Sequence, residues 1–223
     1  MTRKFGIVGL ATGLLLAGSL GASASVIDFT DSSTTTSGTV LGGTVGWSAS
    51  GADSAGNAVN PTTNNTFDGT LPITNSFGLA FDEDGWGIDD DETAGGPPPE
   101  TITITFRYAV RIVGFAFLDL FPDETVQNDA GERGIMTVNG NNYFADFNPA
   151  EDGRGGYAEF LLTTPVFGTV VTFTAGVTND NAGSPDGALA ALKVAPVPLP
   201  AGGLLLLTAL GGVAALRRKR KAA

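Results

Sequence analysis

The chain of 223 residues is acidic, with 23 Asp and Glu against 12 Lys and Arg, and it contains neither cysteine nor histidine. Without these two residue types, disulfide frameworks, thiolate or histidine-ligated metal sites and Ser-His-Asp or Cys-His catalysis are excluded. Seven basic residues lie at the two ends, so residues 25–196 hold all 23 acidic side chains against five basic ones, a net charge of −18. That surface repels nucleic-acid phosphates, which excludes DNA or RNA as a partner.

The N-terminal residues have the pattern of a secretory signal peptide. Arg3 and Lys4 precede an apolar run over residues 5–20, and the small residues Ala22 and Ala24 follow. A charged start, an apolar middle and a small-residue exit predict cleavage after Ala24, which makes residues 1–24 the signal peptide. An uncleaved anchor is the alternative, against which the small residues at 22 and 24 argue.

The C-terminal residues combine three features in a fixed order. A short motif comes first, in which two prolines favour extended backbone. The uncharged stretch 201–216 follows and would span roughly 24 Å as a helix. With residues 197–200 it reaches 20 residues, enough for a hydrocarbon core of about 30 Å if the prolines lie in the interface. The motif residues are Val197, Pro198, Leu199, Pro200 and Ala201.

Five cations end this stretch, and they predict the orientation of the chain. Under the positive-inside rule they stay cytoplasmic, which predicts a membrane-anchored chain with residues 25–196 outside. A buried core helix with a basic end is the alternative, but Thr208 is the one polar residue the stretch offers for a solvated face. The cations are Arg217, Arg218, Lys219, Arg220 and Lys221.

Motif, span and basic cluster together resemble the VPLPA variant of the PEP-CTERM sorting proteins of Gram-negative bacteria. All five motif positions match at residues 197–201, and the resemblance covers residues 197–221. It implies recognition by an exosortase-type membrane protease, cleavage near the motif, and transfer to the cell surface or an exopolysaccharide matrix. The family shares its tail and not its exported domain, so the resemblance implies no specific activity for residues 25–196.

Residues 25–196 have the pattern of one all-β domain. Residues 101–106 alternate Thr with Ile or Phe, which predicts one buried face, whereas 110–120 are apolar on both faces. Asn139-Gly140 predicts a tight hairpin turn between 135–138 and 143–147. Other strands are expected at 26–30, 40–50, 77–81, 157–163, 169–175 and 188–194, with loops at 31–38, 51–66 and 95–99. Many short strands and no helical period predict a single β-sandwich of the jelly-roll type.

One acidic run is a possible calcium site. With Gly85 at the sixth position of an EF-hand loop, Asp82, Asp84 and Asp91 fall on ligand positions, but Ala80 occupies the first. The alternatives are a calcium loop of another kind and a solvated acidic loop. We expect the solvated loop, and therefore no cofactor. The run contains Asp82, Glu83, Asp84, Asp89, Asp90, Asp91 and Glu92.

A second oxygen-rich segment comprises Asn179, Asp180 and Asn181, with Asp186 just before the last strand. Turn chemistry explains these residues as well as calcium does, and we favour turns.

Three functions fit the sequence. The first, which we favour, is a non-catalytic surface or exopolysaccharide-matrix protein with no catalytic residues. The second is a calcium-dependent carbohydrate-binding module, with Trp47, Trp86 and Tyr157 as exposed aromatic platforms for sugar rings. The third is a glycan-acting hydrolase, which needs two carboxylates about 5–10 Å apart. With 23 acidic residues some such pair is certain to exist, so we do not expect an enzyme.

Overall fold

The computed structural model describes residues 23–63, 66–67, 69–70, 72–89, 92–121, 131–148, 153–177 and 185–197. Several predicted features lie outside the described residues. These are residues 1–22 of the signal peptide, including Ala22, the motif beyond Val197, the predicted membrane span, the basic cluster 217–221, Asp90 and Asp91, and residues 179–181. Within the described part no helix has the length and apolar character needed to cross a membrane.

The described residues form eleven strands and no α-helix, which confirms the all-β prediction. Nine strands join one antiparallel sheet in the order β1-β11-β7-β10-β8-β9, with β3 also on β7 and β2 and β4 on β3; β5 and β6 form a separate pair. The strands are β1 (Ser25–Asp28), β2 (Ser37–Val40), β3 (Val45–Ala52), β4 (Ala58–Val59), β5 (Pro61–Thr62), β6 (Gly87–Ile88), β7 (Thr101–Leu118), β8 (Glu132–Val138), β9 (Asn141–Asp146), β10 (Ala158–Val177) and β11 (Ala188–Ala195).

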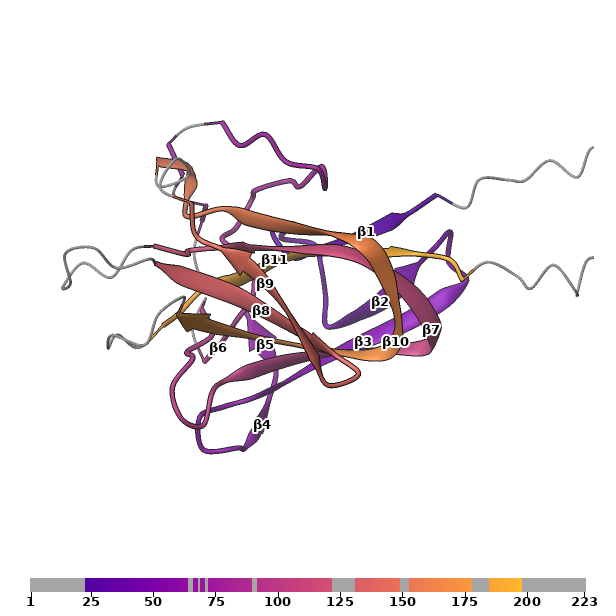
Figure 1. Cartoon of the computed structure of the whole chain (residues 1–223), viewed down its shortest axis with the longest axis horizontal. Coiled ribbons are helices and arrows are strands. Elements are labelled where there is room, and N and C mark those ends of the chain that lie inside the picture. The colour runs from indigo at the N-terminus through magenta and orange to yellow at the C-terminus, as the bar shows by residue number, and fades with distance from the viewer. Residues whose placement is uncertain are drawn as a thin grey trace, which may run out of the picture.

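Two long strands, β7 and β10, shape the domain by bending in the middle (Figure 1). The first part of β7 pairs with β3 and the second with β11, while β10 runs along both parts. The sequence predicted two strands in place of each. That division was wrong because the interruptions at 107–109 and 163–165 shift the ladder without ending the strand.

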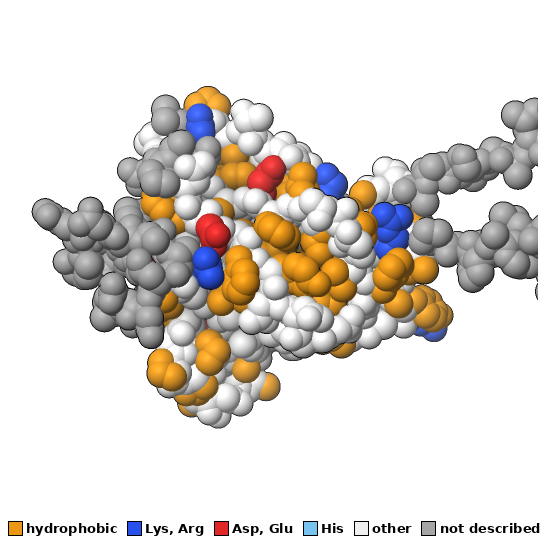
Figure 2. All heavy atoms as spheres, viewed as in Figure 1, with side chains coloured by type: hydrophobic (Ala, Val, Ile, Leu, Met, Phe, Trp, Pro, Cys, Tyr) orange, Lys and Arg blue, Asp and Glu red, His pale blue; other side chains and the backbone are white. Residues whose placement is uncertain are grey.

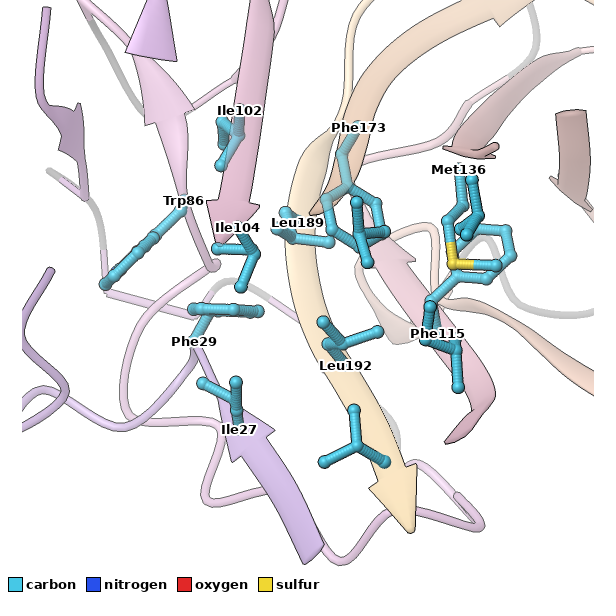
Figure 3. Close-up of a cluster of buried hydrophobic side chains, with 14 of the residues drawn as sticks. Ile27, Phe29, Trp86, Ile102, Ile104, Phe115, Met136, Phe173, Leu189 and Leu192 are labelled. Atoms are coloured by element: carbon cyan, nitrogen blue, oxygen red, sulfur yellow. The ribbon is translucent and has the colours of Figure 1, made fainter. Parts of the chain in front are cut away.

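The core lies between the two halves of these bent strands. Figure 3 shows Ile104 of β7, Phe173 of β10 and Leu192 of β11 directed into it. The prediction for 101–106 is confirmed, since Ile102, Ile104 and Phe106 are buried. All buried residues of both hydrophobic clusters lie between residues 27 and 195, so residues 25–197 contain the whole described core.

The second part of β7 is buried on both faces, as predicted. Strict alternation would place Val110, Ile112, Ala116, Leu118 and Leu120 on one face and Val113, Phe115 and Phe117 on the other, and that assignment of faces is wrong. Val110 and Ile112 pack in the main cluster with Phe115 and Phe117, while Ala116 and Leu118 pack in a smaller cluster. The alternation reverses because the ladder with β11 passes from Ile112 to Gly114 and leaves one residue of β7 unpaired. Such a bulge turns the following side chains to the opposite face.

Some predictions for turns, loops and short strands are confirmed and others are wrong. The hairpin at 139–140 is confirmed, with Asn139 and Gly140 both at positive φ. The expected strand 40–50 is instead two strands joined by a turn at 41–44, and the expected loop 51–66 contains the end of β3 and both β4 and β5. Residues 77–81 form no strand; the Asn75 Oδ1 accepts the N–H groups of residues 77–79, and Phe77 is buried without a ladder.

Candidate functional site

The two ends of the domain leave it side by side. β1 pairs antiparallel with β11, so Ser25 lies opposite Val194, and the Ser25 Oγ accepts the N–H of Leu41. Ala24 and Val197 are exposed. The residue after the predicted signal cleavage and the first residue of the predicted sorting motif therefore lie at the same end of the domain, which we name the tether end.

Part of the acidic run is buried and held by backbone hydrogen bonds, so the run is not simply a solvated loop. Trp86 and Leu189 exchange backbone hydrogen bonds, and the N–H groups of Asp82 and Glu83 both donate to the Thr30 carbonyl. The expectation of a solvated loop is wrong for residues 84–88, which are buried, while Asp82 and Asp89 are exposed. No helix flanks the run within the described residues, which hold no group of three or more potential metal ligands.

The three predicted sugar platforms are buried. Trp47 is 8% exposed, and Trp86 and Tyr157 are each 3% exposed. Both tryptophans pack around Phe29, with ring centroids 6.2 and 4.6 Å from its centroid. The carbohydrate-module hypothesis requires these rings to face water, and they do not, because they build the core.

A partly buried carboxyl pair, Glu132 and Asp186, lies at the opposite end from the tether. The Glu132 carboxylate accepts the N–H groups of Phe121 and Asp186. Burial raises the pKa of Glu132 to about 8, with further increases from the charge of Asp186 and a hydrogen bond to its side chain, against the lowering effect of the Phe121 N–H. The two carboxyls are hydrogen-bonded to each other, whereas a glycosidase pair is separated by about 5 Å or more to leave room for the sugar.

A shallow hollow of about 300 Å³ holds two further carboxylates, Glu159 and Asp146. Partial burial raises the pKa of Glu159, but hydrogen bonds from Ser76 and Tyr157 and the charge of Lys193 outweigh it and lower the pKa. Asp146 forms an ion pair with Arg133 at 2.8 Å. The lowered pKa of Glu159 is opposite to the raised pKa that a general acid needs, so this hollow does not favour the hydrolase hypothesis.

A groove of about 550 Å³ lies between β9 and β10, and we name it the β9–β10 groove. A bulge shapes it, since residues 162–165 of β10 stand opposite the single residue Val113 of β7. Bulges bend a strand and redirect its side chains. The lining residues are Asn139, Tyr143, Phe160, Leu162, Thr163, Thr164, Pro165, Val166 and Phe167.

The aromatic side chains of this groove are held in place. The rings of Tyr143 and Phe160 lie 6.5 Å apart, and Phe160 packs on the buried Phe115 at 5.9 Å. Phe167 is 50% exposed, and the Asn139 Nδ2 donates to its carbonyl at 2.8 Å. The groove thus offers ring faces, hydroxyls and amides, and its lining is uncharged although the domain is strongly acidic.

The sequence did not point to the β9–β10 groove. Its residues come from two strands and a turn, and the bulge that opens it depends on the partner strand. One signal was present, the Thr163-Thr164-Pro165 interruption between apolar residues. No family model, curated protein or solved structure matches the chain.

Proposed function

We propose that this chain is an exported, non-catalytic surface or matrix protein whose VPLPA-type tail is processed by an exosortase-type membrane protease. The observation that carries the proposal is the ordered tail of motif, uncharged span and basic cluster at residues 197–221. The exported part is a β-sandwich of the jelly-roll type. The two halves of β7 and β10 with a core between them support that assignment.

Substitution of the motif prolines tests this proposal. In the double variant Pro198→Ala and Pro200→Ala, helix would extend into the motif, and we expect uncleaved protein to remain in the inner membrane. The matched control is Pro97→Ala with Pro99→Ala, which has the same spacing in an exposed loop. Normal surface delivery of the tail variant, measured by cell fractionation and immunoblotting, would contradict the proposal.

A second function, which can accompany the first, is recognition of an uncharged polysaccharide in the β9–β10 groove. Small-molecule sites combine apolar walls with a few placed polar groups, and this groove has both. Aromatic rings offer flat apolar faces to the C–H faces of sugar rings, and Thr163, Thr164 and Asn139 can bond hydroxyls. The lack of charge in the lining favours a neutral polymer over a uronic acid polymer.

Binding of residues 25–196 to the organism's own exopolysaccharide tests the second function. We expect retardation in affinity electrophoresis that Phe167→Ala weakens about tenfold, corresponding to about 1.4 kcal/mol. Tyr108→Ala is the matched control, because Tyr108 is an exposed aromatic residue outside the groove. Equal retardation of both variants would exclude the groove, and a requirement for calcium would point to a different site.

A further inference from the structure

The bends of β7 and β10 expose apolar side chains at the tether end. Residues 107–109 of β7 have no ladder partner among the described strands, and Tyr108 at their centre is 56% exposed. Phe167 and Val170 of β10 are half-exposed beside them. We name residues 107–111 and 167–170 the crest. Figure 1 shows the bends of both strands at the same end of the molecule as the start of β1 and the end of β11.

The crest differs in charge from the rest of the domain. Its charged residues are Arg107 and Arg111, and the Arg107 guanidinium lies 5.5 Å from the Tyr108 ring centroid. The neighbouring β2–β3 turn at 41–44, the start of β1 at 25–27 and residues 195–197 contain no Asp or Glu. On the face seen in Figure 2, blue and orange side chains lie at this end and the red ones lie away from it. The tether end is thus locally cationic in a domain of net charge −18.

The chain leaves the sheet directly beside the crest. Ala195 of β11 pairs with Arg111, and Val194 pairs with Ile112. Five residues, 196–200, separate this point from the predicted membrane span. Fully extended, they reach about 17 Å, so a domain on an inserted tail stays close to the bilayer.

We propose that the crest docks on the anionic phospholipid surface of the membrane while the tail is inserted. This inference rests on the proposed function, because it takes residues 201–216 as the anchor. Arg107 and Arg111 are attracted to anionic headgroups, Tyr108 suits the membrane–water interface, and the acidic remainder of the domain is repelled toward water. The domain is thereby oriented with Val197 toward the bilayer, where a membrane protease reaches the motif.

Cysteine labelling tests the docking, because the chain has no native cysteine. Two single-cysteine variants of residues 25–223 are labelled with the same fluorophore. Ala109→Cys places the fluorophore on the crest, and Ser54→Cys places it on an exposed loop just after β3, at the other end of that strand from the crest. Both are reconstituted in phosphatidylcholine vesicles with or without phosphatidylglycerol. With phosphatidylglycerol, we expect quenching by lipid-borne nitroxide to be about fivefold stronger at 109 than at 54.

Further measurements distinguish failure of the docking proposal from failure of the proposed membrane anchor. Arg107→Glu with Arg111→Glu should abolish the difference between the two labels, and omitting phosphatidylglycerol should reduce it. Quenching at 109 that keeps its full strength in either arm would overturn lipid docking and indicate another contact, such as a second copy. If the protein floats with the vesicles but both labels are equally accessible, docking alone is wrong. If the protein does not float with the vesicles, the tail is no anchor and the proposed function fails with it.

Discussion

The two ends of the domain are built from the same strands but have opposite character. At the tether end β7 and β10 bend, and the crest formed there contains Arg107 and Arg111. At the opposite end β7 starts and finishes, beside Glu132, Asp186 and the acidic run. The surface at the tether end is thus uncharged or cationic, whereas the surface at the opposite end of the same sheet is acidic. The comparison indicates that charge is distributed along the domain, with Arg107 and Arg111 at the end from which the chain leaves the sheet.

Both ends depend on the core between them, so the largest effect should follow from its truncation. Ile104 is fully buried between the two halves. We expect Ile104→Ala to lower the unfolding free energy by about 2–5 kcal/mol, because it removes buried methyl groups and leaves a cavity. Thr105→Ala is the exposed control next to it. Denaturant unfolding of residues 25–197 measures the unfolding free energy of both variants. A decrease below about 0.5 kcal/mol for Ile104→Ala would show that Ile104 does not face the core.

The acidic end should make stability depend on pH. Glu132 titrates near 4.5 when unfolded and at about 8 when folded, so between these values the folded state holds a proton that the unfolded chain releases. Stability is therefore full below about pH 4.5 and falls as pH rises through 8. We expect a loss of about 1 kcal/mol or more, after allowance for partial solvent exposure.

Glu132→Gln should remove this loss, as measured by thermal unfolding across pH. Glu159→Gln is the control with opposite sign, because the pKa of Glu159 is lowered in the fold. Its contribution is present above the unfolded pKa and disappears as pH falls through the folded one. If Glu132→Gln keeps the wild-type loss of stability as pH rises through 8, the carboxyl at 132 is not the protonated group.

The crest should contribute little to stability, in contrast to the acidic end. Arg107 and Tyr108 are exposed on a stretch without ladder partners among the described strands. We expect Arg107→Glu with Arg111→Glu to change the unfolding free energy by no more than about 0.5 kcal/mol. A substantially larger loss would mean that the crest is a structural element and weaken its assignment as a docking surface.

The smallest effect is expected from calcium. Backbone hydrogen bonds and the buried Trp86 and Ile88 already hold the acidic run. We therefore expect chelation to leave the melting temperature unchanged. A specific site would stabilise by about 2.7 kcal/mol at a hundredfold excess of calcium over Kd. A rise of several degrees that Asp82→Asn and Asp84→Asn abolish would overturn this expectation and make the acidic end a metal site.

Local patterns predicted what depends on local chemistry. The Thr-Ile alternation of 101–106 determined its buried face, and Asn139-Gly140 supplied the positive φ angles of its turn. The face reversal near Val113 could not be predicted, because the bulge is set by pairing with β11. The β9–β10 groove could not be predicted either, because it depends on how strands pair: Tyr143 and Phe167, which line it, come from different strands. The aromatics that were singled out, Trp47 and Trp86, belong to the core.

We propose that the chain is processed at both ends and delivered to the cell surface. Intact mass spectrometry of the protein recovered from the cell surface or the culture medium can test this proposal. We expect a species that starts at Ser25 and ends near residues 197–201, without the basic cluster 217–221. Recovery of a surface species that retains Met1 or the intact tail to Ala223 would contradict it.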